Sequence, residues 1–170
     1  MSFGEPTLIG EGFVGSGPNA AHLNVVLGRK GGPVETAWVT ALATPRLGHA
    51  PFVAILQPNV PVKPLTLFVN KADIRGDGHA HLTWGAAQAG VARGVAGAVA
   101  DGLVPREEVD ELLLMAAVWV DWAADDAEAV YRNNSEATRA ALEAAAAGRP
   151  SIDEILAALE TPFNAFFRPG

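Results

Sequence analysis

In residues 20–28 apolar side chains recur at every second position, and a turn-like segment precedes them. This pattern constrains the fold more than any other feature of the chain. Positions 23, 25 and 27 are all leucine or valine and share one face of a strand, whereas His22 and Asn24 share the other. Residues 7–14 are also short and β-rich, and the intervening segment 15–19 is typical of a turn. The sequence therefore predicts an antiparallel hairpin whose apolar face is turned to the core.

His22 is a titratable side chain on the second, more polar face of this predicted strand. With the Asn24 amide beside it, the imidazole can serve as a general acid. The alternative is an ordinary surface histidine on a half-solvated strand, and the spacing alone does not separate the two interpretations. His22 is thus a candidate catalytic residue.

Size, charge and composition exclude several classes of function. The chain has 170 residues, 49% of them hydrophobic, which is enough to bury the core of one domain over residues 1–170. Its net charge of −7, with no basic run longer than Arg29-Lys30, argues against a nucleic-acid partner. The absence of cysteine excludes thiolate nucleophiles and cysteine zinc sites.

Neither a secretory signal nor a membrane span is apparent in the sequence. The first residues lack a basic stretch followed by an apolar run, and no segment approaches the roughly 20 apolar residues that a span requires. We therefore expect a cytoplasmic protein with no membrane partner.

The middle of the chain alternates short helical and β-rich segments. A helix is predicted over residues 34–43, and strands are predicted over 52–56 and 65–74, joined by an extended, proline-rich link at 58–64. Residues 79–100 have helical composition but contain Gly85, Gly90, Gly94 and Gly97. Such small residues indicate close contact with a neighbouring backbone or, alternatively, with a ligand.

The C-terminal part is predicted to be mostly helical. Helices are expected from Pro105 and over residues 123–147, whereas the apolar run 113–122 fits a buried helix or a buried strand equally well. Ser151 and Glu154 have the capping-box spacing at the start of a last helix, 151–159. The tail then carries three phenylalanines, which should dock on the chain's own core or on another subunit: Phe163, Phe166 and Phe167.

Lys71, Asp73 and Gln88 are further candidate binding residues. Alternation along the predicted strand 65–74 places Lys71 and Asp73 on one face, where they form either an exposed ion pair or an anchor for an anionic or carbonyl-bearing ligand. Gln88 has glycine and alanine neighbours, so it is either a solvated helix residue or an amide that a ligand can approach.

No metal site or phosphate-binding motif is predicted. His79 and His81 alternate and could flank a metal, but no third ligand has a supporting spacing, and a position just after a turn suits exposed side chains. No phosphate loop, nucleophile elbow or dinucleotide fingerprint occurs. We therefore expect general acid–base catalysis without a permanently bound cofactor.

Several strings between about Gly10 and Leu142 are unusual in their composition, order and spacing. They are Gly10-Glu-Gly-Phe-Val-Gly15, Ala21-His22, Gly32-Pro-Val-Glu-Thr-Ala37, Pro58-Asn-Val-Pro-Val-Lys-Pro64, Asn70-Lys71, Ala87-Gln-Ala-Gly-Val-Ala92 and Glu136-Ala-Thr138. In their order and spacing these strings resemble the formaldehyde-activating enzyme family, which comprises the 5,6,7,8-tetrahydromethanopterin hydro-lyases.

The resemblance implies a fold, an assembly and a reaction. The fold is an α/β (α+β) two-layer sandwich like the second domain of small-subunit ribosomal protein five, which favours a strand at 113–122. The assembly is a homopentamer with substrate sites between adjacent subunits. The reaction condenses formaldehyde with the co-substrate tetrahydromethanopterin in one-carbon metabolism and formaldehyde detoxification.

The resemblance also assigns roles to individual residues. His22 corresponds to the family's proposed proton donor, and imidazole, with an ordinary pKa of about 6.5, suits proton delivery near neutral pH. Lys71 and Gln88 match family substrate contacts, and Val53 replaces a leucine. Two further contacts depart from the pattern, because Asn24 replaces an aspartate and Asp73 replaces a threonine.

The two departures leave alternatives open. Asp73 could supply, from the neighbouring strand, the carboxylate that Asn24 lacks and so stabilise positive charge during water loss. Otherwise the chain is a paralogue that acts on another pterin or carbonyl compound, or a non-catalytic protein that binds a pterin or an aldehyde.

Overall fold

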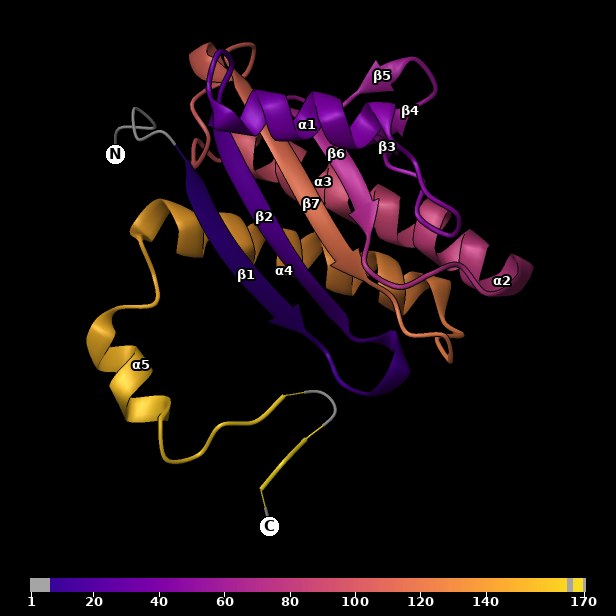
Figure 1. Ribbon diagram of the computed structural model, residues 1–170, viewed down its shortest axis with the longest axis vertical. Helices are drawn as coiled ribbons and strands as arrows, with labels where there is room; N and C mark the ends of the chain where they lie inside the picture. The colour runs from indigo at the N-terminus through magenta and orange to yellow at the C-terminus, as the bar shows by residue number, and fades with distance from the viewer. Residues whose placement is uncertain (1–6, 165–166, 170) are drawn as a thin grey trace.

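The computed structural model describes residues 7–164 and 167–169 and has a five-stranded sheet at its centre (Figure 1). The strand order is β1-β2-β7-β6-β3, in which only β6 and β7 run parallel. A short two-stranded ribbon, β4-β5, follows the β3 edge. The strands are β1 (Leu8–Val14), β2 (Ala21–Arg29), β3 (Phe52–Val53), β4 (Ile55–Gln57), β5 (Val60–Pro61), β6 (Leu65–Asn70) and β7 (Leu112–Trp119).

The predicted hairpin is confirmed as the β1-β2 pair, whose loop contains a 3₁₀ turn at Gly17–Asn19. The alternation along β2 also has the predicted consequence. Leu23, Val25 and Leu27 are buried in the main core, whereas His22 and Asn24 are only partly buried on the opposite face. The sheet therefore presents an apolar side and a chemically mixed side.

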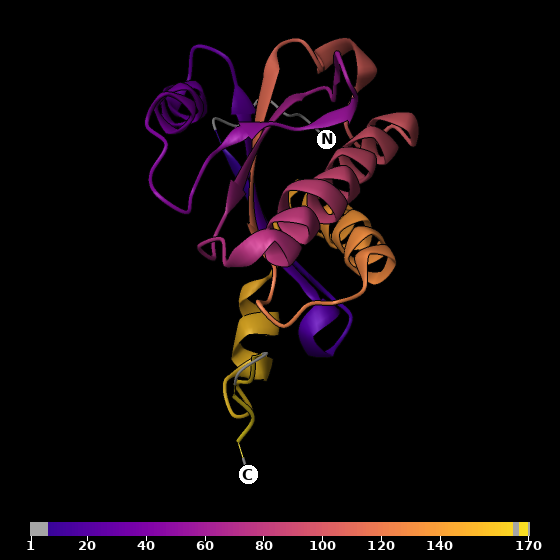
Figure 2. The same ribbon diagram turned by 90° about the vertical axis from the view of Figure 1, so that its right-hand side faces the viewer.

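Two long helices form a second layer on the apolar side of the sheet (Figure 2). Helix α4 (Ala127–Ala147) packs on β1 and β2, and α3 (Gln88–Ala100) packs beside α4. Helix α3 continues, through a π-helical segment at His81–Ala87, from the short α2 (Gly76–Ala80). This arrangement confirms the α+β sandwich that the family resemblance implies.

Glycines permit the close contact between these helices. A Cβ at Gly90 would lie 2.4 Å from the carbonyl oxygen of Tyr131, and one at Gly94 would lie 2.7 Å from that of Ser135. The predicted contact with a neighbouring backbone is confirmed at these two positions. At Gly85 and Gly97 no atom of another element lies within 4 Å of the corresponding point, so the predicted contact with a neighbouring backbone is wrong there.

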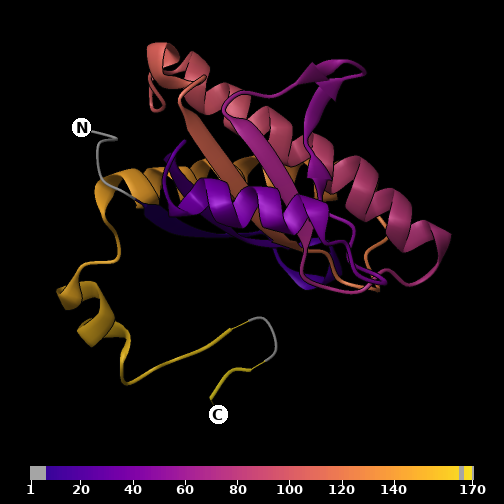
Figure 3. The ribbon, with the colours of Figure 1, turned by 45° about the horizontal axis from the view of Figure 1, so that its top comes forward.

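Helix α1 (Pro33–Ala43) lies on the opposite face of the sheet (Figure 3) and crosses only one end of its strands (Figure 1). Val34 and Trp38 pack against Leu67 and Leu113, and the Trp38 indole N–H donates to the carbonyl oxygen of Leu114 at 3.1 Å. Among the described residues, no other helix packs on this face. The end of the sheet that carries His22 is therefore uncovered by helices.

Several predicted boundaries are wrong. The strand expected over 65–74 ends at Asn70, because the Asn70 amide donates to the carbonyl oxygens of Gly48 and Ala72 and turns the chain. The helix expected from Pro105 is only a 3₁₀ turn, Arg106–Glu108. The open choice at 113–122 is decided for a strand, β7. Helix α4 begins four residues later than position 123, at Ala127, where the Asp126 side chain accepts from the Ala129 N–H.

The last helix, α5 (Ile152–Ala158), has the predicted capping box between Ser151 and Glu154. The tail does not dock on the chain's own core, since Phe163 is 69% exposed and Phe167 is also exposed. Phe166 lies outside the described residues. Docking of this tail on another subunit stays a prediction. Within the described part of the chain, no helix has both the length and the hydropathy needed to cross a bilayer.

Candidate active site

The candidate site lies on the uncovered part of the sheet, where side chains from four strands meet in register. One row across the sheet is Glu11, Asn24, Ala117 and Val69. The next row pairs Phe13 with His22 and His22 with Trp119, and Lys71 follows directly after β6. Because alternate residues of a strand share a face, these two rows lie on the same side of the sheet as α1.

Glu11 is directed to this face by the glycines on either side of it. A Cβ at Gly10 would lie 1.9 Å from the carbonyl oxygen of Ala141, and one at Gly12 would lie 2.1 Å from that of Ala137. Both α-carbons therefore press against α4 on the far side of β1. Their glycine identity lets the strand approach the helix closely and fixes Glu11 on the opposite, open face.

Glu11 and His22 form a direct pair between adjacent strands. The Glu11 Oε1 atom lies 3.1 Å from His22 Nε2, which is within hydrogen-bonding distance. The His22 side chain is 40% exposed and that of Glu11 more so, so water reaches both groups. The ring of His22 also lies 6.1 Å from that of Phe13, centroid to centroid. The imidazole is thus held by a carboxylate on one side and an aromatic ring on another.

Lys71 and Asn24 form a second polar pair beside the first. The Lys71 ammonium donates to Asn24 Oδ1 at 2.5 Å, although β7 separates β6 from β2. The residue of β7 opposite Asn24 is Ala117, whose small side chain leaves room for the lysine to cross that strand. Asn24 therefore holds Lys71 near His22 without neutralising its charge.

The charges around His22 act on its pKa in opposite directions. Partial burial, and secondly the positive charge of Lys71, lower the pKa of His22, whereas the charge and hydrogen bond of Glu11 oppose that decrease. Burial also lowers the pKa of Lys71, and Glu11 opposes that shift too. The fraction of His22 that is protonated near neutral pH thus depends on both neighbours.

Replacing Lys71 with methionine should raise the pKa of His22. The substitution removes the positive charge and keeps an unbranched side chain, so the imidazolium gains stability relative to the neutral ring. The measurement is an NMR titration of the His22 Cε1–H signal in ligand-free protein. An unchanged or lower midpoint would show that Lys71 does not act on the histidine. Lys63→Met is the matched control, because Lys63 pairs with Asp110 at a different exposed site.

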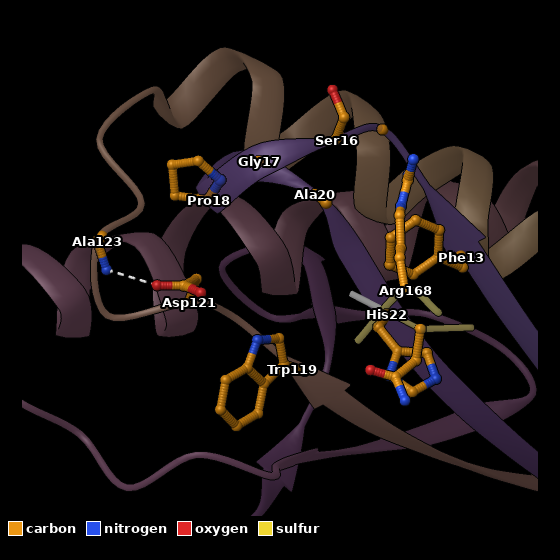
Figure 4. A pocket seen from close by; sticks show the side chains of 12 residues that line it. Phe13, Ser16, Gly17, Pro18, Ala20, His22, Trp119, Asp121, Ala123 and Arg168 are labelled. Atoms are coloured by element: carbon orange, nitrogen blue, oxygen red, sulfur yellow. Dashed lines mark hydrogen bonds between the residues drawn. The ribbon is translucent and has the colours of Figure 1, made fainter. Parts of the chain in front are cut away.

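A pocket of about 420 Å³ opens beside the His22 side chain (Figure 4). Trp119 and Asp121 line it from the end of β7, residues 15–18 line it from the β1-β2 loop, and Arg168 lines it from the C-terminal segment. Asp121 is held in place, since its carboxylate accepts from the Ala123 N–H at 2.8 Å. The pocket offers a flat aromatic wall and a titratable group to a small ligand.

Asp73 is directed elsewhere. It lies in the loop after β6, and β7 separates that strand from β2, so Asp73 does not stand on a strand next to His22. A substrate contact by its carboxylate stays a prediction. Its carboxylate lies 3.6 Å from Arg75 Nε, and its carbonyl oxygen accepts from the Trp122 indole at 3.0 Å. The Arg75 guanidinium stacks on Trp122, 3.5 Å from the ring centroid. Asp73 is thus part of a loop contact.

Val53 and Gln88 lie at the β3 edge, with β6 and β7 between them and β2. Val53 packs in the small cluster under α1. Gln88, on α3, is buried, and its Oε1 atom accepts from the Ile55 N–H at 2.5 Å. The interpretation of Gln88 as a solvated residue is therefore wrong. Within one chain, neither residue is brought together with His22.

His79 is not the exposed residue that its position after a turn suggests. It is 5% exposed, its Nδ1 accepts from the Arg75 N–H at 3.2 Å, and its Nε2 lies 3.1 Å from the carbonyl oxygen of Val120. Since Nδ1 accepts, Nε2 carries the proton and donates to that carbonyl. Nε2 thus joins α2 to the residue that follows Trp119 at the end of β7, whereas Nδ1 bonds to the backbone at the start of α2. His81 is exposed on the helical turn that follows.

Sequence reasoning missed three residues that face the site: Glu11, Trp119 and Asp121. A partial signal for Glu11 was present, because period-two alternation puts residue 11 on the face opposite to its glycine neighbours. Its place opposite Asn24 comes only from the observed register. Trp119 and Asp121 could not be assigned to a face while 113–122 was equally compatible with a helix. Their placement depends on β7 lying next to β2.

Comparisons with known proteins identify the family of this chain. The sequence profile of the formaldehyde-activating enzyme (Fae) family matches residues 9–167. The chain is 43% identical to a 5,6,7,8-tetrahydromethanopterin hydro-lyase of Methanosarcina barkeri, over 94% of this chain and 90% of that protein. It is also 40% identical to the bifunctional enzyme Fae/Hps of Methanococcoides burtonii and 36% identical to that of Archaeoglobus fulgidus, over 88% and 93% of this chain.

The two bifunctional relatives are much longer proteins. The match covers 38% of the Methanococcoides burtonii protein and 40% of the Archaeoglobus fulgidus protein. The similarity to the Methanosarcina barkeri hydro-lyase, by contrast, extends over nearly all of both chains. The chain belongs to the formaldehyde-activating enzyme family.

Proposed function

We propose that this protein condenses formaldehyde with tetrahydromethanopterin, giving methylene-tetrahydromethanopterin and water, with His22 as the general acid. Family membership and the hydro-lyase relative support the reaction. The observation that carries the role of His22 is its position in the wall of a pocket, with a carboxylate at hydrogen-bonding distance. A group so placed can exchange a proton with a bound ligand and with solvent.

The mechanism follows from the chemistry of the reactants. One amine nitrogen of the pterin adds to formaldehyde and forms a carbinolamine. The His22 imidazolium delivers a proton to the carbinolamine hydroxyl, which leaves as water and produces an iminium ion. The second amine then attacks this ion, closes the methylene bridge and releases a proton that recharges His22. Two N–H bonds and one formaldehyde are consumed for each water released.

Catalysis also requires that the two amines be held close together. Trp119 lies beside His22 in the pocket wall, where its ring offers a flat apolar surface to a pterin ring. Substrate contacts are proposed for Asn24, Val53, Lys71, Asp73 and Gln88. Of these, Asn24 and Lys71 have the strongest support, because they form a pair on the same sheet face as His22. Positioning of this kind is a large part of an enzyme's advantage over a spontaneous reaction.

The protein is proposed to need no permanently bound cofactor, since tetrahydromethanopterin is consumed as a co-substrate. Such an activity serves one-carbon metabolism and formaldehyde detoxification. The cytoplasmic location and the single domain over residues 1–170 stay predictions.

A homopentamer with sites between subunits is proposed as the working assembly. The separation of Val53 and Gln88 from His22 within one chain supports it, because a second subunit can bring its own copies of these residues to the site. The exposed aromatic side chains of the tail also suit contacts between subunits. Sedimentation equilibrium measures the subunit number. Restored activity after mixing and reassembling His22→Ala and Gln88→Ala subunits would support a shared site.

The direct test mixes purified protein with formaldehyde and tetrahydromethanopterin and follows formation of the methylene adduct by stopped flow. The spontaneous rate, measured without protein and with heat-denatured protein, is subtracted. A rate that increases in proportion to protein concentration supports the proposal. A rate that never exceeds the spontaneous one contradicts it.

The neutral Asn24 favours a second candidate, an enzyme of the same kind that acts on a different pterin. A carboxylate at this position would stabilise a cationic intermediate, and asparagine supplies none. The same assay with tetrahydrofolate separates the candidates. Faster turnover with tetrahydrofolate than with tetrahydromethanopterin would support the second one.

A further inference from the structure

The uncovered sheet face holds a carboxylate that the proposed mechanism has not used. Glu11 Oε1 lies 3.1 Å from His22 Nε2. Asp73, the carboxylate that the sequence suggested for this region, faces Arg75 in a different loop contact. Among the described residues, Glu11 is the carboxylate that pairs with His22.

We propose that Glu11 is the positioning residue for His22, orienting the imidazole through Nε2 so that Nδ1 exchanges the proton with substrate. This inference rests on the proposed function and deepens it. In the charged imidazolium both nitrogens carry protons, and the Nε2–H donates to Glu11. The Nδ1 proton passes to the departing hydroxyl, and the proton released when the second amine closes the bridge returns to Nδ1. Glu11 remains ionised throughout.

The backbone around Glu11 supports a fixed position rather than a chance surface contact. Glu11 stands between Gly10 and Gly12, whose α-carbons press against the carbonyl oxygens of α4. The strand therefore cannot rotate Glu11 away from the open face without losing this packing. The antiparallel register places Glu11 opposite Asn24. His22 is the next residue on the same face of β2, so the Glu11 side chain reaches it as a diagonal cross-strand neighbour.

Electrostatics gives the pair a function. The charged groups that face this site are Glu11 on β1, Lys71 after β6, Asp121 after β7 and Arg168 in the C-terminal segment. Burial and Lys71 lower the pKa of His22 and so reduce the population of the acid form, and Glu11 acts against both. A general acid must be protonated when substrate arrives, which is the state that Glu11 stabilises.

The test is Glu11→Gln, which keeps the size of the side chain and removes its charge. Because His22 then loses its proton at lower pH, the decline of kcat with increasing pH should begin at lower pH than in the wild type. At about pH 8 we expect kcat to decrease on the order of tenfold, and at low pH the two rates should converge. In ligand-free protein, the NMR titration midpoint of His22 should decrease as well.

Two further variants separate a specific role from a structural one. Glu11→Asp keeps the charge at the same place on β1, so its pH profile should lie between those of the wild type and Glu11→Gln. Glu108→Gln removes a carboxylate that pairs with Arg29 at 2.8 Å, away from the pocket, and should leave the profile unchanged. Thermal unfolding of each variant checks that the fold is intact.

The two readouts distinguish failure of this inference from failure of the proposed function. If wild-type protein condenses formaldehyde but Glu11→Gln changes neither the pH profile nor the His22 titration, the positioning role is refuted and the function stands. If the titration midpoint decreases while the wild type shows no condensation above background, the proposed function fails and the coupling of Glu11 to His22 stands.

Discussion

Replacing His22 with alanine is expected to lower kcat by roughly a hundredfold to ten-thousandfold, the usual contribution of a general acid. The pocket beside His22 would remain, because its other walls come from the β1-β2 loop, the end of β7 and the C-terminal segment. Pterin affinity should therefore change little. The measurements are stopped-flow condensation after subtraction of the spontaneous rate, and pterin binding without formaldehyde, followed by quenching of tryptophan fluorescence.

The control for this prediction is His81→Ala, which removes an exposed histidine from the segment that follows α2. It should leave both kcat and pterin affinity unchanged. If His22→Ala retained the wild-type rate, a general-acid role for this residue would be ruled out. Equal losses of rate and affinity would instead assign His22 to substrate binding.

Replacing Gly10 with alanine is expected to destabilise the fold by about 3 kcal/mol, at the upper end of the range for overpacking. The new Cβ would lie 1.9 Å from the carbonyl oxygen of Ala141, a backbone atom that cannot move aside without displacing α4. Urea unfolding, followed by circular dichroism, measures the change in free energy. Because β1 would shift and carry Glu11 with it, the condensation rate should decrease too.

Gly97→Ala is the matched control, because it makes the same substitution at a glycine that is not in close contact with another element. Gly97 lies in α3, and no atom of another element lies within 4 Å of the point where its Cβ would be. Since alanine has the higher helix propensity, this variant should gain up to about 1 kcal/mol of stability. A Gly10→Ala protein as stable as the wild type would show that β1 and α4 are not in the close contact described.

The parts of the fold that depend on local chemistry were predictable. Alternation along residues 20–28 and a turn-rich loop were enough to predict the hairpin and to separate the buried face of β2 from the face that carries His22. The capping box at Ser151 and Glu154 could be predicted equally well, because both of its hydrogen bonds lie within one helical turn. In both the hairpin and the capping box, the residues that carry the sequence pattern are also the residues that form the structural feature.

Features that depend on a partner distant in the sequence were missed. The end of β6 at Asn70 is set by an amide that reaches the carbonyl oxygen of Gly48. The burial of His79 depends on the carbonyl oxygen of Val120, far along the chain. Neither partner can be deduced from the residues next to it, so a strand was extended too far and a buried histidine was expected to be exposed.

The sequence by itself determined the hairpin, the apolar face of β2 and the family to which the chain belongs. The first two follow from the alternation of side chains with a period of two, and the third follows from short sequence motifs. The tertiary structure alone decided which groups surround the histidine. The register of β1 brings Glu11 to His22, and the placement of β7 beside β2 brings Trp119 to it. Strand order and register depend on how the whole sheet packs against α3 and α4, and no local pattern encodes them.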